Sequence, residues 1–191
     1  MCRTYKNDRS DIVSSSYNNE CVSGNLDKTV TNVVKLLKQN GWTISTAESC
    51  TGGLLSELIT SVAGASEVFE LGICSYSERI KNELLGVPLA DIAEHGVVSE
   101  QVALAMVKGL KQRSGAEVCV SVTGIAGPSG GTPEQPVGTV YIGFDINGKQ
   151  FVRLPELWEL PDTSRENIRR AAAAYAFETI ERILTEEISV R

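Results

Sequence analysis

Histidine, paired cysteines and long apolar runs are scarce or absent in this sequence, and each shortage excludes a class of protein. The 191 residues include one histidine, so a hydrolase that uses a histidine base has only His95 to supply it. The five cysteines are an odd number without a C-x-x-C pair, which favours reduced thiols over a disulfide framework or a zinc site. No segment approaches the roughly 20 apolar residues of a membrane-spanning helix, so we expect a soluble, cytoplasmic protein without a membrane partner.

Positive charge is also in short supply. The formal net charge is −6, from 18 Lys and Arg against 24 Asp and Glu. This balance provides no net attraction for nucleic acid or anionic lipid, so we expect no nucleic-acid partner. A small anionic ligand would need a local positive site.

The first 25 residues differ in composition from the rest of the chain. They are polar, aperiodic and rich in Ser and Asn, with too few large apolar side chains to offset the entropy of ordering. We interpret residues 1–25 as a flexible N-terminal extension and residues 26–191 as one folded domain. Acidic residues in the extension argue against an organelle transit peptide.

Helical and strand-like patterns alternate through the domain. Apolar residues at helical spacing predict helices over residues 26–41, 51–64, 77–86, 99–115 and 163–187. β-prone runs predict strands over residues 42–47, 71–76, 116–124, 137–145 and 149–157. The alternation predicts an α/β fold, layered α/β/α with a mixed sheet, in which parallel strands come first and an antiparallel hairpin is appended.

The segment TAESCTGG lies at a strand-to-helix turn, where an enzyme can hold a nucleophile. Ser49 at this turn can present its hydroxyl to a ligand, while backbone N–H groups near Gly52 and Gly53 form an oxyanion hole. The alternative is that Ser49 or Thr51 caps the helix and that the glycines relieve crowding. Cys50 is intrinsically the better nucleophile, but a cysteine beside an apolar core is commonly inert.

A serine nucleophile needs a base. The single histidine, His95, falls in a predicted loop before a helix capped by Ser99, where a structural or surface role is favoured over catalysis. The other candidates are Tyr76 and Lys81 in SYSERIKNELLG, which we expect near the sheet edge where the strand of Ser49 ends. Lysine acts as a base only if desolvation or nearby positive charge lowers its pKa toward neutrality. The alternative is an exposed helical lysine.

A glycine-rich loop follows the third predicted strand, which ends at Thr123 and Gly124. Its sequence, IAGPSGGTPEQP, can form an anion nest from successive backbone N–H groups, or it can be an ordinary surface loop. It matches neither the Walker nor the Rossmann pattern. Arg165 at the start of the last helix, together with Arg169 and Arg170, is a candidate phosphate contact or part of a solvated face.

Five segments together resemble one known family. They are TAESCTGG, SYSERIKNELLGV, EHGVVSEQVA, VSVTGIAGPSGGTPEQPVGTVYIGF and SRENIRRAAAAYA. In this order, from about residue 27 to 187, they resemble the CinA C-terminal domain family, the nicotinamide-nucleotide amidohydrolases. Two of the motifs, AESCTGG and TGIAGP…GG…PVGTV, are long and specific.

The resemblance implies hydrolysis of the carboxamide of nicotinamide mononucleotide to nicotinate mononucleotide and ammonia, in pyridine-nucleotide salvage, without a cofactor or metal. It implies that Ser49 is the nucleophile, that Lys81 is the general base and that Tyr76 is a third catalytic residue. A homodimer or larger homo-oligomer is the expected assembly. The residues expected to contact the nucleotide substrate are Thr51, Gly52, Gly53, Thr123, Gly124 and Arg165.

The sequence departs from the family pattern in two ways. Glu78 stands where asparagine is common, and its negative charge would raise the pKa of Lys81, the wrong direction for a base. Many relatives also carry a second, N-terminal domain, which a chain of this length is too short to hold, so we expect the stand-alone form. The competing hypotheses are a non-catalytic nucleotide- or phosphate-binding module of the same fold and an amidohydrolase with another substrate.

Overall fold

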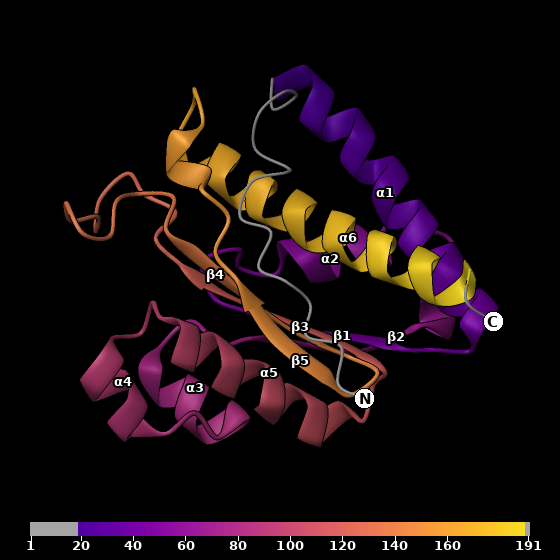
Figure 1. Ribbon diagram of the computed structural model, residues 1–191, viewed down its shortest axis with the longest axis horizontal. Helices are drawn as coiled ribbons and strands as arrows, with labels where there is room; N and C mark the ends of the chain where they lie inside the picture. Colours follow the sequence, from indigo (N-terminus) through magenta and orange to yellow (C-terminus); the bar gives the residue numbers. More distant parts are fainter. Residues whose placement is uncertain (1–18, 190–191) are drawn as a thin grey trace.

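The computed structural model describes residues 19–189, which are built around a five-stranded sheet (Figure 1). β1 pairs in parallel with β2 and β3, whereas β4 pairs antiparallel with β3 and β5. The predicted mixed sheet, with parallel strands first and a hairpin appended, is confirmed. In spatial order the strands are β2 (Phe69–Cys74), β1 (Ile44–Glu48), β3 (Val118–Gly124), β4 (Val140–Ile146) and β5 (Lys149–Arg153).

Helices cover both faces of the sheet, so the layers are α/β/α as predicted (Figure 1). One face carries α1 (Asn19–Asn40), α2 (Leu54–Thr60) and α6 (Arg165–Ser189). The other face carries α3 (Glu78–Leu85), α4 (Leu89–His95) and α5 (Glu100–Ser114). Two short 3₁₀ helices, η1 (Ala65–Glu67) and η2 (Leu157–Glu159), complete the fold. No helix among residues 19–189 combines the length and hydrophobicity that a bilayer crossing requires.

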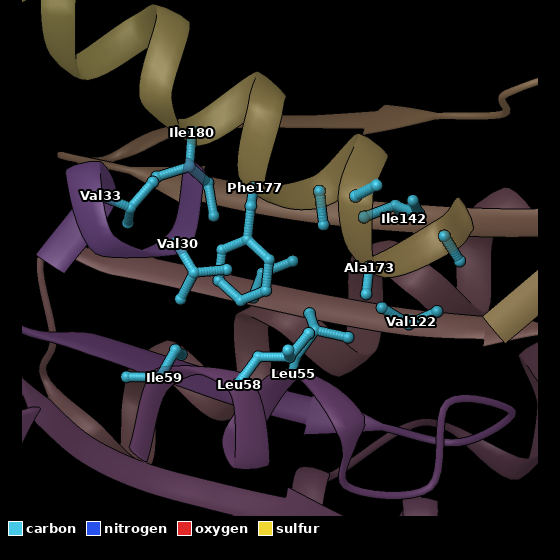
Figure 2. Close-up of a cluster of buried hydrophobic side chains, with 14 of the residues drawn as sticks. Val30, Val33, Leu55, Leu58, Ile59, Val122, Ile142, Ala173, Phe177 and Ile180 are labelled. Carbon is cyan, nitrogen blue, oxygen red and sulfur yellow. The ribbon is translucent and has the colours of Figure 1, made fainter. Parts of the chain in front are cut away.

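The larger part of the core lies between the sheet and α1, α2 and α6. Figure 2 shows Phe177 and Ile180 of α6 together with Val30 of α1 and Leu55 of α2 in one buried cluster. Residues 171–174 of α6 are four buried alanines. Their small side chains let this long helix lie close against its neighbours at the density typical of a protein interior.

The second part of the core holds α3 against α5. Leu85 of α3 is buried in one cluster with Met106 and Leu110 of α5. Gly109 of α5 has no room for a side chain, because a Cβ there would overlap the carbonyl oxygen of Leu85. This close approach fixes α3, and with it the side chains that α3 directs toward the sheet.

Two elements differ from the sequence prediction. α1 begins at Asn19, inside the segment assigned to the extension, and residues 1–18 lie outside the described part of the chain. α4 occupies residues for which we expected a loop around His95. Ile92 is the one buried side chain of this short, fully described helix, so there is no apolar stripe from which periodicity could predict it. The domain boundary itself stays a prediction.

The carboxyl ends of the three parallel strands define one edge of the sheet, as expected for a ligand site in such folds. These strands end at Glu48, Cys74 and Gly124. The loop between β3 and β4 and the first turn of α6 lie at the same end of the molecule (Figure 1). They touch directly, because Arg165 Nη1 donates a hydrogen bond of 2.8 Å to the carbonyl oxygen of Gly127.

Candidate active site

One buried carboxylate holds the turn between β1 and α2. Glu48, the last residue of β1, is 1% exposed. Its Oε2 accepts hydrogen bonds from the N–H groups of Gly53 (2.9 Å) and Leu55 (3.1 Å), and its Oε1 accepts from the N–H (3.0 Å) and the hydroxyl (2.9 Å) of Ser56. Glu48 therefore satisfies the first N–H groups of α2, where a negative charge is also favourable.

Ser49 is free for another partner because Glu48 takes over the capping of α2. Neighbouring side chains of a strand point to opposite faces of the sheet, so Ser49 lies on the face of α3 rather than that of α2. Gly53 occupies the N-cap position of α2 without a side-chain cap. The alternative that Ser49 or Thr51 caps this helix is therefore wrong.

Lys81 reaches Ser49 from the first turn of α3. The hydroxyl of Ser77 accepts a hydrogen bond from the N–H of Ile80 at 3.3 Å and so begins the helix four residues before Lys81. Lys81 is 0% exposed, and its Nζ donates to Ser49 Oγ (2.9 Å) and to the carbonyl oxygen of Ser75 (2.7 Å). Within the described part of the chain Lys81 forms no ion pair. The exposed-lysine alternative is thus wrong.

Burial lowers the pKa of Lys81 below its ordinary value of 10.5, because the charged ammonium loses its hydration. The Glu78 carboxylate, and the Cys50 and Cys74 thiols once they ionise, act in the opposite direction, yet the net shift of the pKa is downward. The glutamate at position 78 therefore does not reverse the effect of burial. A neutral Lys81 can accept the Ser49 proton across the contact that already joins them.

The cysteine beside Ser49 is a poor nucleophile. Cys50 is 6% exposed, and burial raises the pKa of its thiol to about 12. The thiol therefore stays protonated near neutrality, and only a thiolate attacks efficiently. Of the two adjacent candidates, the structure pairs Ser49 with Lys81 and leaves Cys50 buried as a thiol.

Some backbone N–H groups of the turn form hydrogen bonds within the protein, and others stay available to a ligand. Gly52 N–H donates to the carbonyl oxygen of Ser49 at 3.1 Å, and Gly53 N–H donates to Glu48. Among the described residues, no backbone carbonyl of another residue accepts from the N–H groups of Cys50 and Thr51, and the Cys50 N–H interacts only with its own thiol. The Thr51 hydroxyl is likewise buried without a partner in that part of the chain. The N–H groups of Gly52 and Gly53, where we expected oxyanion donors, are thus engaged within the protein.

Tyr76 and Arg165 form an exposed rim instead of joining the serine and lysine. Tyr76 is 63% exposed, and its hydroxyl accepts a hydrogen bond of 3.2 Å from Arg165 Nη2. In the described part of the chain no hydrogen bond connects Tyr76 to Ser49 or Lys81. The structure thus brings Ser49 and Lys81 together and pairs the Tyr76 hydroxyl with Arg165. The catalytic role expected for Tyr76 stays a prediction.

A cavity with a volume of about 300 Å³ lies beside the turn and is rich in arginine. Arg169 Nε and Nη2 donate to the carbonyl oxygen of Thr51 at 3.2 and 2.7 Å, which joins the cavity wall to the turn. Such guanidinium groups suit a phosphate or carboxylate ligand. The cavity is lined by Leu54, Arg165, Glu166, Arg169 and Arg170.

Thr123 and Gly124 make their contacts inside the fold. The hydroxyl of Thr123 donates to the carbonyl oxygen of Val97 at 2.8 Å. A Cβ at Gly124 would lie 2.7 Å from the carbonyl oxygen of Thr139 and 2.8 Å from the Cα of Val140, so glycine lets β4 approach. Both residues have a structural role here, and their contact with a substrate stays a prediction.

Sequence reasoning missed Glu48 and Ser75. The signal for Glu48 was an acidic side chain shortly before a predicted helix, where carboxylates commonly bind N–H groups. Ser75 contributes its backbone carbonyl to Lys81, and a backbone acceptor leaves no mark in a sequence. Arg169 was considered only as a neighbour of Arg165, although it is the arginine that binds the turn.

Neither a metal cluster nor the histidine forms part of this arrangement. Among residues 19–189, no three His, Cys, Asp or Glu side chains gather as potential metal ligands. His95 is exposed at the end of α4, with its Nε2 3.8 Å from Glu94 Oε1. Its position agrees with the structural or surface role that we expected for this histidine.

Comparison with known proteins identifies the family. The family model described as "CinA C-terminal domain" matches residues 26–184. The chain belongs to the CinA C-terminal domain family. The CinA resemblance carried by the five sequence segments is thereby confirmed.

Relatives and solved structures agree with the CinA assignment. The chain is 47% identical over 152 residues to the CinA-like protein of Kosmotoga olearia and 44% identical over 152 residues to a putative competence-damage inducible protein of Caldanaerobacter subterraneus subsp. tengcongensis. Each match covers 80% of this chain and 36% of the relative. The chain thus spans about a third of the length of these curated relatives.

The crystal structure of the competence/damage inducible protein CihA from Agrobacterium tumefaciens superposes with a TM-score of 0.79 at 36% identity, over 85% of this chain and 96% of that chain. A CinA superfamily protein from Klebsiella pneumoniae 700603 superposes with a TM-score of 0.78 at 27% identity, over 84% of this chain and 98% of the other. The predicted α/β fold is that of CinA superfamily proteins.

Proposed function

We propose that this CinA domain hydrolyses the carboxamide of nicotinamide mononucleotide to nicotinate mononucleotide and ammonia, in pyridine-nucleotide salvage. The observation that carries the proposal is the 2.9 Å contact between Lys81 Nζ and Ser49 Oγ inside the fold. A serine beside a desolvated lysine is an activated nucleophile that needs no histidine. The choice of substrate rests on the resemblance to nicotinamide-nucleotide amidohydrolases.

In the first half of the proposed reaction, Ser49 attacks the amide carbon. Neutral Lys81 takes the hydroxyl proton as the bond from Ser49 Oγ to that carbon forms, and the amide oxygen becomes an oxyanion. The N–H groups of Cys50 and Thr51 stabilise this charge. Lys81 then passes its proton to the amide nitrogen, the carbon–nitrogen bond breaks, and ammonia leaves an acyl-enzyme.

In the second half, water replaces ammonia. Lys81 takes a proton from the water as its oxygen attacks the acyl carbon, and a second oxyanion forms in the same place. Collapse of this intermediate breaks the bond to Ser49 Oγ, which recovers its proton from Lys81. One base thus serves both steps, and nicotinate mononucleotide is released.

The arginine-lined cavity is the proposed site for the 5′-phosphate. Arg165 connects the exposed rim to the loop between β3 and β4, and Arg169 connects the cavity to the carbonyl oxygen of Thr51. A phosphate held here lies beside the turn that carries Ser49. Arg170 is already paired with Glu166 at 3.3 Å, so we expect it to contribute less.

Ammonia release from nicotinamide mononucleotide tests this function. Wild type should release ammonia, and Ser49→Ala should release none above background, because it lacks the nucleophile. Ser66→Ala, at an exposed position of η1, is the matched control and should keep wild-type activity. Full activity in Ser49→Ala would disprove the mechanism. An inactive but folded wild type would favour a non-catalytic binding module or an amidohydrolase with another substrate.

We also propose a cytoplasmic location and a homodimer or larger homo-oligomer. The location rests on the five cysteines, whose odd number and spacing suit a reducing compartment. The assembly rests on family resemblance. A mass from light scattering equal to that of one chain would contradict the homo-oligomer.

A further inference from the structure

Glu48 is the buried charged group that the proposed mechanism leaves without a role. It lies on the opposite face of the sheet edge from Lys81 and makes all four of its hydrogen bonds to the start of α2. Cys50, Glu78 and Cys74 are the groups that raise the pKa of Lys81 against burial, whereas the Glu48 carboxylate forms its hydrogen bonds with Gly53, Leu55 and Ser56. The Glu48 carboxylate instead binds backbone N–H groups at the end of the turn and the start of α2.

Hydrogen bonds hold most backbone N–H groups of the turn between β1 and α2. Ser49 N–H donates to the carbonyl oxygen of Val122 on β3 at 3.0 Å, and Gly52 N–H donates back to the carbonyl oxygen of Ser49. Glu48 holds the next N–H group, that of Gly53. In the described part of the turn, the N–H groups of Cys50 and Thr51 are the ones that no other residue's backbone carbonyl binds.

Arg169 constrains the same turn from the side of α6. Its two hydrogen bonds to the carbonyl oxygen of Thr51 set the plane of the peptide between Thr51 and Gly52. With Glu48 holding Gly53, the next peptide is set as well. A peptide segment fixed at both ends keeps the intervening N–H groups in one orientation, which is what stabilisation of an oxyanion requires.

We propose that Glu48 is a positioning residue that sets the oxyanion hole of Ser49. It acts through the backbone: its carboxylate holds the N–H groups at the start of α2 and thereby fixes the N–H groups of Cys50 and Thr51 where the oxyanion forms. This inference rests on the proposed function in one respect, that Ser49 is the nucleophile. It does not depend on nicotinamide mononucleotide being the substrate.

A fluorophosphonate probe tests the oxyanion hole without the natural substrate. Ser49 Oγ forms a bond to phosphorus, the phosphorus–fluorine bond breaks, fluoride leaves, and Lys81 takes the hydroxyl proton. The phosphoryl oxygen occupies the place of the oxyanion during this step. The measured quantities are the maximal labelling rate kinact, the half-saturating probe concentration KI, and the dependence of kinact on pH.

Glu48→Gln should slow the labelling of Ser49. A glutamine has one acceptor oxygen, and its NH₂ group meets N–H groups that need an acceptor, so the turn loses its fixed geometry. We expect kinact to fall by about 100-fold, the size of effect seen when one oxyanion donor is removed. KI and the pH at which kinact is half-maximal should stay unchanged, because neither the cavity nor Lys81 is altered. Glu48→Asp, whose side chain is one methylene shorter, should also lower kinact. This second variant tests the inference if Glu48→Gln does not fold.

Glu117→Gln is the matched control. Glu117 is another partly buried glutamate that binds backbone, accepting from the N–H (2.8 Å) and hydroxyl (3.1 Å) of Thr43. It lies at the opposite ends of β1 and β3 from Ser49. Its loss should lower the midpoint of urea unfolding and leave kinact unchanged.

The outcomes separate this inference from the proposed function. If folded Glu48 variants are labelled as fast as Glu117→Gln, Glu48 serves only stability and the inference is overturned. A shift in the pH dependence of kinact would also overturn it, because Glu48 would then act on the base. Wild type that is not labelled at Ser49 would overturn it too. Wild type that is labelled but releases no ammonia would refute the proposed substrate alone.

Discussion

The inner and outer sides of the candidate site differ in whether their charged side chains are buried or exposed to solvent. On the inner side, Lys81 is 0% exposed and Glu48 is 1% exposed, and both bind groups of the protein. On the outer side, Tyr76 is 63% exposed and Arg165 lies at the surface. Burial lowers the pKa of a lysine, whereas exposed arginines stay charged and accessible to an anion. In the proposed mechanism, the inner side therefore carries the bond-breaking step and the outer side captures the ligand.

The largest effect on this comparison is expected from Lys81→Met, which removes the proposed base but keeps a long apolar side chain. General bases contribute about 10²–10⁴-fold, so kcat for ammonia release should fall by a factor in that range. Lys108→Met, in an exposed lysine of α5, should leave kcat unchanged. Retained activity in Lys81→Met would show that the inner side does not supply the base.

Lys81→Met should also change how the free energy of unfolding depends on pH. In the unfolded chain the lysine titrates near 10.5, whereas in the folded chain its pKa is lower. Between these two pKa values the unfolded state binds more protons, so the free energy of unfolding of wild type rises with pH in this window. Urea unfolding should show this rise in wild type relative to Lys81→Met. An identical pH dependence for both proteins would mean that the lysine pKa is not lowered.

A smaller effect is expected from Arg165→Ala on the outer side. Loss of a charged hydrogen bond of about 1.5–3 kcal/mol corresponds to a rise in KM of about 10–100-fold, with kcat little changed. The nucleoside without the 5′-phosphate serves as the control substrate, and its kinetics should be the same for both proteins. A fall in kcat without a rise in KM would place Arg165 on the inner, chemical side of the comparison.

The smallest effect is expected from Glu78→Gln, because this carboxylate is exposed and opposes the shift caused by burial. Its removal should lower the pKa of Lys81 further and move the rising limb of the pH–kcat profile to lower pH. Glu83→Gln, one turn further along α3, is the control and should leave that limb in place. A move to higher pH after Glu78→Gln would contradict the assigned sign of this charge.

The sequence predicts which residues form the inner side, but it does not predict how deeply they are buried. Ser49 was expected at a β-to-α turn and Lys81 one helical turn into the next helix, and both lie there. Helical spacing indicates which face a lysine occupies, whereas its depth depends on how α3 packs on α5 through Leu85 and Gly109. That packing joins segments more than 20 residues apart, which local patterns do not encode.

The outer side was predictable mainly through composition. A chain with net negative charge needed a local positive site for an anion, and Arg165, Arg169 and Arg170 line one cavity. The partners of these arginines could not be read from spacing, because they bind backbone carbonyls of Gly127 and Thr51 in distant segments. For the same reason Tyr76 was expected beside the base, while its hydroxyl pairs with Arg165.

The titration of Lys81 itself tests the central claim most directly. Protein with ¹³C at the lysine Cε positions shows one NMR signal per lysine, and the signal missing from Lys81→Met assigns Lys81. We predict a titration midpoint below 10.5, in keeping with a buried lysine that can accept the Ser49 proton. A midpoint at or above 10.5 would contradict the account, because Lys81 would then stay charged and could not act as the base.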